Sequence, residues 1–501
     1  MAEEKEQARM PEGQPEGAAL EFNEFEALLQ KEFKPKTDRV KGAIGTAVRT
    51  LAEQALAETT LIGEDAIKTI EAIIAEIDRR LSEQINVIMH NENFQQLEAT
   101  WRGLHHLVSN TETDETLKIR ILNLPKKDLA KTIKKYKGAA WDQSPLFKKI
   151  YEAEYGTPGG EPYGCLIGDY YFDHGPPDVE MLNGIAQTAA AAHTPFISAA
   201  APSLMNMESW QELSNPRDLT KIFQTPDYAP WRSLRDSEDS KYIGLAMPRF
   251  LGRLPYGAKS DPVEAFDFEE DVDAVNHSKY LWVNAAYAMG TNITRSFKLY
   301  GWCARIRGVE SGGIVEGLPC HTFPTDDGGV DMKCPTEIAI TDRREAELAK
   351  NGMMPLSHWK NTDYAAFIGA QSLQKPAEYD DPDATANARL AARFPYLFAV
   401  SRFAHYLKCI VRDKIGSFKE RKDMEDWLNR WISRYVTSDP SASETTKAQY
   451  PLAAAEVTVE EIEGNPGYYS AKFFLRPHYQ LEGLTVSLRL VSKLPSVKSA
   501  G

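Results

Sequence analysis

The C-terminal end of the sequence constrains the fold most, because it carries three apolar strand patterns and no helix to cover them. The patterns occupy residues 457–462, 469–475 and 484–491, with a turn signal at 464–467. An open apolar sheet edge recruits another strand unless something blunts it. We therefore predict strand exchange between subunits; the alternative is a sheet completed within its own domain. The residues expected at the shared edges are Tyr469, Ala471, Phe473, Leu475, Leu484, Val486, Leu488 and Leu490.

Composition narrows the class of protein. The chain has 501 residues and a formal charge of -14, so nucleic acid and anionic membranes are not expected partners. No segment has the apolar length of a signal peptide core or a membrane span. The cysteines are scattered and odd in number, which favours a reducing, cytosolic compartment over a disulfide framework. They are Cys165, Cys303, Cys320, Cys334 and Cys409.

The N-terminal region is expected to contain a helix on a flexible leader. Residues 1–19 have the composition of a disordered tail, and residues 20–34 form an amphipathic helix. Burying its apolar side chains contributes about 1.5 to 3 kcal/mol each, and ordering each residue costs about 1 to 2 kcal/mol. The helix should therefore dock weakly on a partner, or pack on its own domain. Its apolar side chains are Leu20, Phe22, Phe25, Leu28, Leu29 and Phe33.

Residues 40–110 are predicted to be a helical segment with a heptad seam. Its apolar positions are Ile67, Ile70, Ile74, Ile77, Leu81 and Ile88, and a phase break is expected at His90 and Asn91. A second apolar stripe then resumes from Phe94 to Val108. Such a seam fits an antiparallel helix pair within the domain and, equally, a helix from a partner.

The remaining chain predicts an α/β (α+β mixed) fold with a mixed-sheet middle domain at 111–377 and a C-terminal domain at 378–501. Strands are expected at 117–121, 163–172, 195–199, 242–248, 336–340 and 365–370. Helices are expected at 178–193, 281–300, 384–414 and 419–435. The strand, helix and strand between residues 163 and 199 indicate a βαβ crossover and hence a parallel strand pair.

The sequence offers no clear catalytic constellation. It lacks a phosphate-binding loop of the GxxxxGK(S/T) type, and its Cys and His residues lack the spacing of zinc sites. We expect no metal, no cofactor and no enzymatic activity. The alternative is a cytosolic α/β enzyme with a site near Asp169, His174 and Asp178, at the end of an expected strand.

Several long blocks, in order, carry a specific resemblance. They are residues 98–104 (EATWRGL), 164–170 (GCLIGDY), 231–257 with GRLPYG at 252–257, 306–313 (IRGVESGG), Pro319 and 394–397 (FPYL). From about residue 40 onward the sequence resembles the TssC family, also called VipB, ImpC or EvpB. These proteins are the large subunits of the contractile sheath of bacterial type VI secretion systems.

The resemblance implies a structural role in a helical polymer. It implies pairing with the small sheath subunit TssB, stacking around an Hcp tube, contact with baseplate components, and contraction that drives the tube outward. It also implies β-sheets shared between neighbouring subunits, which agrees with the C-terminal strands. By position, the helix at 20–34 is expected to be recognised by the AAA+ unfoldase ClpV after contraction. The small subunit is the natural partner for the heptad seam.

Overall fold

The computed structural model describes residues 66–215, 217–273, 276–325, 327–414, 421–461 and 469–480. The helix expected at 20–34 and the strand expected at 484–491 lie outside these residues. The chain divides into two compact units. The first contains residues up to 94 together with 255–273, and the second contains 95–254 and the chain from 274 onward.

In the first unit, α3 (Ala66–Met89) ends at a turn formed by His90 and Asn91, where the sequence predicts the phase break. The 255–273 segment packs on the end of this helix. The Asn86 side chain donates to the Glu269 carbonyl at 2.9 Å and accepts from the Asp271 N–H at 2.8 Å. These two bonds fix exposed backbone groups of an irregular segment to the helix.

The second unit is built around a six-stranded mixed sheet with the order β1-β2-β3-β9-β10-β6. Its strands are β1 (Leu166–Phe172), β2 (Phe196–Ala200), β3 (Ile243–Met247), β9 (Met353–His358), β10 (Ala365–Phe367) and β6 (Ile314–Val315). The first four run parallel, and β10 is antiparallel to both β9 and β6. The predicted mixed α/β fold with a parallel pair is confirmed.

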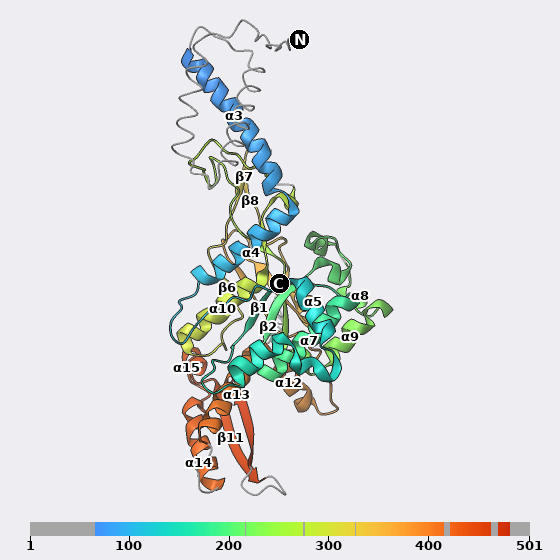
Figure 1. Ribbon diagram of the computed structural model, residues 1–501, viewed down its shortest axis with the longest axis vertical. Coiled ribbons are helices and arrows are strands. Elements are labelled where there is room, and N and C mark those ends of the chain that lie inside the picture. The colour runs from blue at the N-terminus through green and yellow to red at the C-terminus, as the bar shows by residue number, and fades with distance from the viewer. Residues whose placement is uncertain are drawn as a thin grey trace, which may run out of the picture. The chain divides into compact units, whose positions relative to one another are not determined.

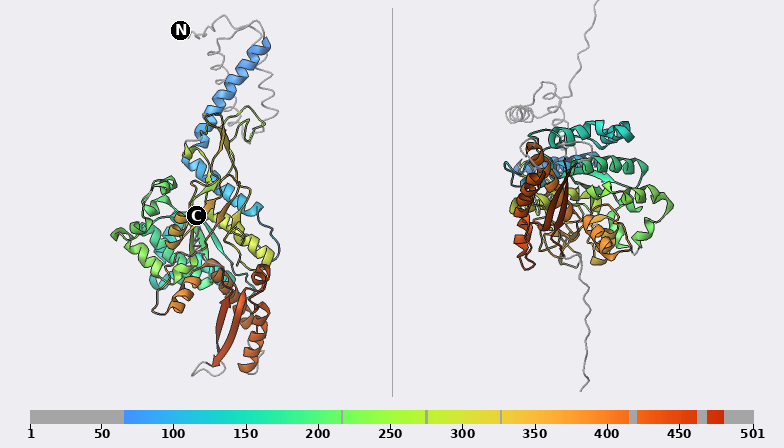
Figure 2. Two further views of the ribbon diagram at one scale, coloured as in Figure 1. Left: turned by 180° about the vertical axis from the view of Figure 1, so that it is seen from behind. Right: turned by 90° about the horizontal axis from the view of Figure 1, so that it is seen from below.

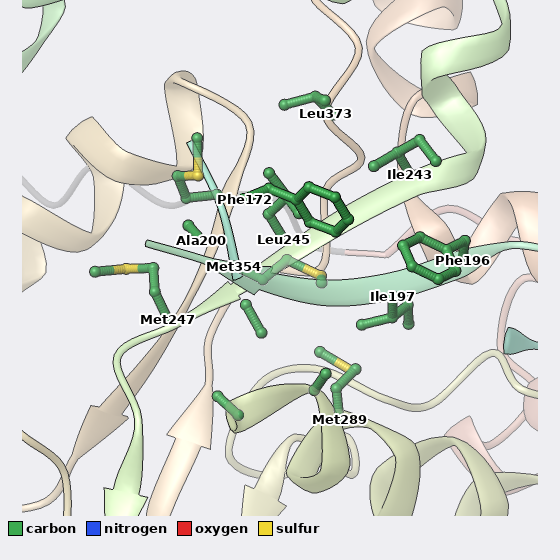
Figure 3. Close-up of a cluster of buried hydrophobic side chains, with 14 of the residues drawn as sticks. Phe172, Phe196, Ile197, Ala200, Ile243, Leu245, Met247, Met289, Met354 and Leu373 are labelled. Carbon is green, nitrogen blue, oxygen red and sulfur yellow. The ribbon is translucent and has the colours of Figure 1, made fainter. Parts of the chain in front are cut away.

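Helices cover both faces of this sheet. α7 (Pro176–Ala192) is the β1-to-β2 crossover, and α10 (Ala285–Tyr300) lies on the opposite face (Figure 1). Figure 3 shows Ile197 pointing toward Met289 of α10, whereas Phe172 lies on the other side of the strands. All three side chains are buried. The period of two along the strands thus supplies two apolar faces, as parallel sheets need.

Further elements complete the second unit, one of which begins in the first unit. The helices are α4 (Glu92–Ser109), α5 (Lys126–Lys135), α6 (Pro145–Phe147), α8 (Leu219–Ile222), α9 (Ala229–Asp236), α11 (Asp342–Lys350) and α12 (Pro382–Ala391), with a π-helix at Lys148–Tyr155. Two small antiparallel sheets pair β4 (Phe250–Leu251) with β5 (Trp282–Val283) and β7 (Thr322–Pro324) with β8 (Val330–Met332), and the second pair is a hairpin.

The C-terminal part forms a second apolar core. It contains α13 (Phe394–Lys414), α14 (Arg421–Ile432), α15 (Glu444–Gln449), β11 (Leu452–Glu461) and β12 (Tyr469–Pro477). Figures 1 and 2 show the two strands side by side against α14. The buried side chains of this core are Trp302, Phe403, Leu407, Leu428, Ile432, Leu452, Val457 and Val459.

Three expected elements differ from the structure, and one inner strand of the main sheet was not predicted. Residues 117–121 and 336–340 are not strands; the first is an irregular segment whose Ile121 is 70% exposed, and the second forms one isolated bridge at Thr336. Strand β9 was not predicted, because Pro355 in its centre is atypical of an inner strand. The helix expected at 384–414 is two helices, since Pro395 starts a new first turn.

Candidate functional site: subunit assembly surfaces

The β11–β12 hairpin has one apolar and one polar face. Its register pairs Val457 with Phe473 and Val459 with Ala471. Those four side chains belong to the second core, while Thr458 and Lys472 on the other face are exposed. The alternation predicted from the sequence is therefore present in both strands. A two-stranded sheet alone is only marginally stable, so packing on α14 holds it in place.

The outer edge of β11 is capped by side chains of α14. Asn429 accepts from the Val457 N–H at 2.9 Å and donates to the Val457 carbonyl at 2.7 Å. Glu425 accepts from the Val459 N–H at 2.8 Å, and Arg421 donates to the Val459 carbonyl at 2.9 Å. Side chains thus take the place of a neighbouring strand, and this edge is closed to further pairing.

Among the described residues, the outer edge of β12 has no neighbouring strand. Because the backbone groups of Val457 and Val459 point toward α14, their partners Phe473 and Ala471 are non-hydrogen-bonded pairs of the antiparallel ladder. In such pairs both residues turn their N–H and C=O groups away from each other. Ala471, Phe473 and, by the same alternation, Leu475 therefore present these groups outward. Within the described residues, no backbone partner is found for them.

The solvent face of the hairpin adds an apolar side chain to this edge. Phe474 is 58% exposed, next to the exposed Lys472, which pairs with Glu460 of β11 at 2.7 Å. An exposed ion pair of this kind contributes little to stability. A strand added to β12 would therefore meet free backbone groups and an uncovered aromatic ring at one edge.

The main sheet also has an edge strand that lacks a second neighbouring strand in the described part of the chain. Strand β1 is at the end of the strand order and pairs only with β2 within the described residues. The irregular segment at 117–124 runs alongside it, since Lys118 reaches Glu161 before β1 and the Leu124 carbonyl accepts from the Tyr170 hydroxyl at 2.6 Å. Arg120 also pairs with Glu161 at 2.8 Å. Contacts at the two ends thus hold the segment beside β1.

An open groove of about 1480 Å³ lies between this segment, β1, α4 and α10. Four of its apolar lining residues are more than half exposed: Leu97 (56%), Trp101 (64%), Ile121 (70%) and Leu122 (52%). Small-molecule sites usually measure about 300 to 1,000 Å³ and enclose their ligand. A larger apolar groove beside an open strand edge suits a polypeptide segment instead.

In the first unit, the seam of α3 remains partly uncovered. Ile74 and Ile88 are 52% and 48% exposed, while Ile77 and Leu81 are half-buried. The side chains of Ile67 and Ile70 lie outside the described part of the chain. A stripe of this kind is typical of a helix that packs against a further helix.

The three residues of the enzyme alternative do not form a site. Asp169 accepts from the Thr100 hydroxyl at 2.6 Å and from the Asn284 amide at 3.2 Å. His174 stacks on Tyr228 with the ring centroids 4.1 Å apart. Asp178 accepts from Lys126 at 2.8 Å. Each side chain has its own structural contact, and no shared reacting centre results.

Sequence reasoning missed the residues that close one edge and line the groove. A signal for the first set was present, because Arg421, Glu425 and Asn429 follow one another at a spacing of four and so share one face of α14. For the groove, the alternation at 117–121 was interpreted as a strand when these residues instead form its outer wall.

One buried histidine joins α13 to the end of α7. His405 of α13 is 2% exposed, and its Nε2 lies 2.8 Å from the Ala192 carbonyl at the end of α7. A carbonyl oxygen only accepts, so Nε2 carries the proton and donates it. Burial lowers the pKa of His405 to about 4, because the charged imidazolium would lose its hydration.

Comparison with known families identifies the class of protein. The family model "EvpB/VC_A0108, tail sheath N-terminal domain" matches residues 71–374, and "EvpB/VC_A0108, tail sheath gpW/gp25-like domain" matches residues 383–494. The chain therefore belongs to the EvpB/VC_A0108 tail-sheath family, which is a family of structural sheath proteins and not of enzymes.

The chain is also similar to one curated protein over most of its length. The chain is 74% identical over 479 residues to the type VI secretion system sheath protein TssC1 of Pseudomonas aeruginosa PAO1, covering 95% of this chain and 96% of the relative. Among solved structures, a chain of the anti-feeding prophage baseplate matches with a TM-score of 0.37 and 11% identity, over 75% of this chain and 84% of that one. A contracted PVC sheath complex of an extracellular contractile injection system matches with a TM-score of 0.31 and 10% identity, over 62% of this chain and 68% of that one.

In the described ranges, every helix falls short of the length and apolarity needed to cross a bilayer.

Proposed function

We propose that this chain is the large subunit of a type VI secretion sheath, which forms a helical tube with the small subunit TssB and further copies of itself. The tube surrounds an Hcp tube, contracts to propel it, makes contact with baseplate components, and is taken apart afterwards by ClpV. This assembly takes place in the bacterial cytoplasm, a reducing compartment that the unpaired state of all five cysteines supports.

The proposal rests on a difference between the two outer edges of the β11–β12 hairpin. α14 caps the β11 edge with three side chains, while the β12 edge leaves the backbone groups of Ala471, Phe473 and Leu475 outward. A strand from a neighbouring subunit would pair there, each backbone bond contributing about 0.5 to 1.5 kcal/mol net. Several such bonds between every pair of neighbours hold a tube together while it changes shape.

The groove beside β1 is the proposed seat of TssB. Its apolar wall and the free edge of β1 suit an extended segment that adds a strand and buries its side chains against Trp101 and Ile121. The exposed stripe of α3, with Ile74 and Ile88, is assigned to a helix of the same partner. The helix at 20–34 keeps its proposed role as the ClpV handle, in which many weakly docked copies along a sheath would act together.

The decisive experiment is hydrogen exchange at residue resolution on the TssB complex before and after tube formation. Before assembly, we expect the amides of Ala471, Phe473 and Leu475 to exchange rapidly, because the described part of the chain provides no acceptor for them. After assembly they should be protected. The amide of Phe474 pairs inward with β11 and should be protected in both states, so it is the internal control.

The alternative occupant of the β12 edge is residues 484–491 of the same chain. If that segment completes the sheet internally, the three outward amides will already be protected before assembly, and sharing at this edge is refuted. Ala471→Pro removes one outward donor without touching an internal ladder bond and should abolish tubes while the TssB complex stays intact. Lys472→Ala changes only an exposed side chain on the same strand and should leave tubes unchanged.

A further inference from the structure

Two cysteines lie opposite each other at the base of the β7–β8 hairpin. The ladder pairs Thr322 with Met332 and Pro324 with Val330, and the Lys333 N–H donates to the His321 carbonyl at 2.8 Å. One further step in this register places Cys320 opposite Cys334. That position is of the non-hydrogen-bonded type, in which the two Cα atoms are about 4.5 Å apart. A disulfide needs a Cα separation of about 4.4 to 6.8 Å.

An imidazole lies beside one of these thiols. His358 at the end of β9 is near enough to Cys334 to lower the pKa of that thiol, and its Nε2 lies 2.9 Å from the Thr362 carbonyl. Since a carbonyl oxygen only accepts, Nε2 carries the proton and Nδ1 is the acceptor. Cys334 Sγ is also 3.3 Å from the Thr336 hydroxyl. This is the arrangement in which a histidine takes up the proton of a thiol and leaves a thiolate.

The surroundings of the two cysteines shift their thiol pKa values in opposite directions. Burial raises the pKa of Cys334, but the His358 imidazole and the Thr336 hydroxyl beside it outweigh this effect, so that this pKa lies below its usual value. Burial raises the pKa of Cys320, with Asp363 and Cys334 adding to the effect. Cys320 Sγ lies 3.8 Å from the same Thr362 carbonyl that holds His358. The pair therefore consists of one thiol whose pKa is lowered and one thiol whose pKa is raised.

We propose that Cys334 and Cys320 form a peroxide-sensitive thiol pair, in which His358 activates Cys334 and Cys320 closes a disulfide across the base of the β7–β8 hairpin. In the first step, the Cys334 thiolate attacks hydrogen peroxide. The S–O bond forms, the O–O bond breaks, and the departing hydroxide takes the proton held by His358 to give water. Sulfur is oxidised to a sulfenic acid and the peroxide is reduced.

In the second step, the Cys320 sulfur attacks the Cys334 sulfur. The S–S bond forms, the S–O bond breaks, and the leaving hydroxide takes the Cys320 proton as a second water. In sum, two thiols and one peroxide give one disulfide and two waters. Both cysteines are half-buried, so a small oxidant reaches them. Across the described residues, no three His, Cys, Asp or Glu side chains converge as metal ligands would.

The test is peptide mapping of the full-length purified chain after treatment with hydrogen peroxide. Cleavage after Arg307, Lys333 and Arg343 puts the two cysteines on different peptides, so the disulfide appears as a linked pair that reductant separates. Cys320→Ser should abolish the link and leave Cys334 as a sulfenic acid that dimedone captures. Cys334→Ser should abolish both products. These readouts do not depend on sheath assembly.

Alkylation rates test the role of His358 separately. In the folded chain, Cys334 should react with iodoacetamide much faster than Cys303, whose pKa burial raises to about 12. His358→Gln should slow Cys334 roughly tenfold for each pKa unit regained, and Cys409→Ser should change nothing. The proposal is overturned if no peptide links Cys320 to Cys334, or if Cys334 reacts no faster than Cys303 in the wild-type chain.

Discussion

Replacing Asn429 by leucine would remove the cap on the β11 edge while keeping a side chain of similar size. The change deletes the bond from the Val457 N–H at 2.9 Å and the bond to the Val457 carbonyl at 2.7 Å. Val457 is 1% exposed. A buried polar backbone group left without a partner costs about 1 to 3 kcal/mol. Asn429 itself is half-buried, so water reaches this edge and keeps the cost for each group near the lower limit of this range. The total for the Val457 N–H and C=O groups is then about 2 kcal/mol.

The amide of Val457 reports this cost directly. Hydrogen exchange on the TssB complex should show the Val457 amide opening roughly 30-fold more often in Asn429→Leu, since 1.4 kcal/mol corresponds to a factor of ten. The Val459 amide keeps its acceptor on Glu425 and should change less. Asn429→Asp keeps an acceptor for the Val457 N–H but sets a carboxylate against the Val457 carbonyl, which separates the two bonds.

An unchanged exchange rate at Val457 in Asn429→Leu would refute the edge-capping argument, because another group or a water would then satisfy the strand equally well. Glu425→Gln is the matched control, since the amide oxygen can still accept from Val459. If Asn429→Leu behaves as expected, the hairpin gains a second open edge. Tubes of this variant should then be irregular, because a neighbouring strand has two edges to choose from.

Two further predictions concern the groove and the buried histidine. Ile121→Glu should abolish co-purification with TssB without unfolding the chain, since Ile121 is 70% exposed; Leu299→Glu, which is 60% exposed and outside the groove, should leave the complex intact in the same pull-down. His405 has its pKa lowered to about 4 by burial, so its contribution to stability is complete above pH 6.5 and is lost as the pH falls from 6.5 toward 4. At pH 5 this loss is about 2 kcal/mol, and denaturant unfolding should show a smaller difference between pH 7 and pH 5 in His405→Gln than in the wild type.

The layers of the fold could be predicted from side-chain periodicity. The alternation in residues 457–461 and 469–475 predicts which face of the hairpin is apolar, and the structure places Val457, Val459 and Phe473 on that face. The break between α3 and α4 at His90 and Asn91 could be predicted because the helical phase shifts there. In both cases a local pattern and the packed face follow the same physical rule.

Elements whose stability comes from distant contacts could not be predicted in this way. Pro355 lies in the inner strand β9, where the missing N–H is tolerated because the flanking strands hold the register on both sides. The alternating residues 117–121 resemble a half-buried strand, yet β1 is separated from them by the groove. Whether an alternating segment pairs with a neighbouring strand depends on what lies between them. Where that is a partner chain, the sequence of this chain carries no information about it.

The chain has two strand edges that can pair, at β12 and β1, and one that is capped, at β11. It therefore offers pairing surfaces and also blocks wrong pairing. Side chains specify the faces of a strand, but its edges consist of backbone groups that are the same for every residue except proline. An edge is therefore closed only where another element supplies donors and acceptors, as Arg421, Glu425 and Asn429 do along β11. The β12 edge has no such cap among the described residues, whereas on β1 the Tyr171 carbonyl accepts from the Lys126 side chain. Specific assembly then requires only that a partner's side chains match the faces beside these edges, Phe474 at one and Trp101 and Ile121 at the other.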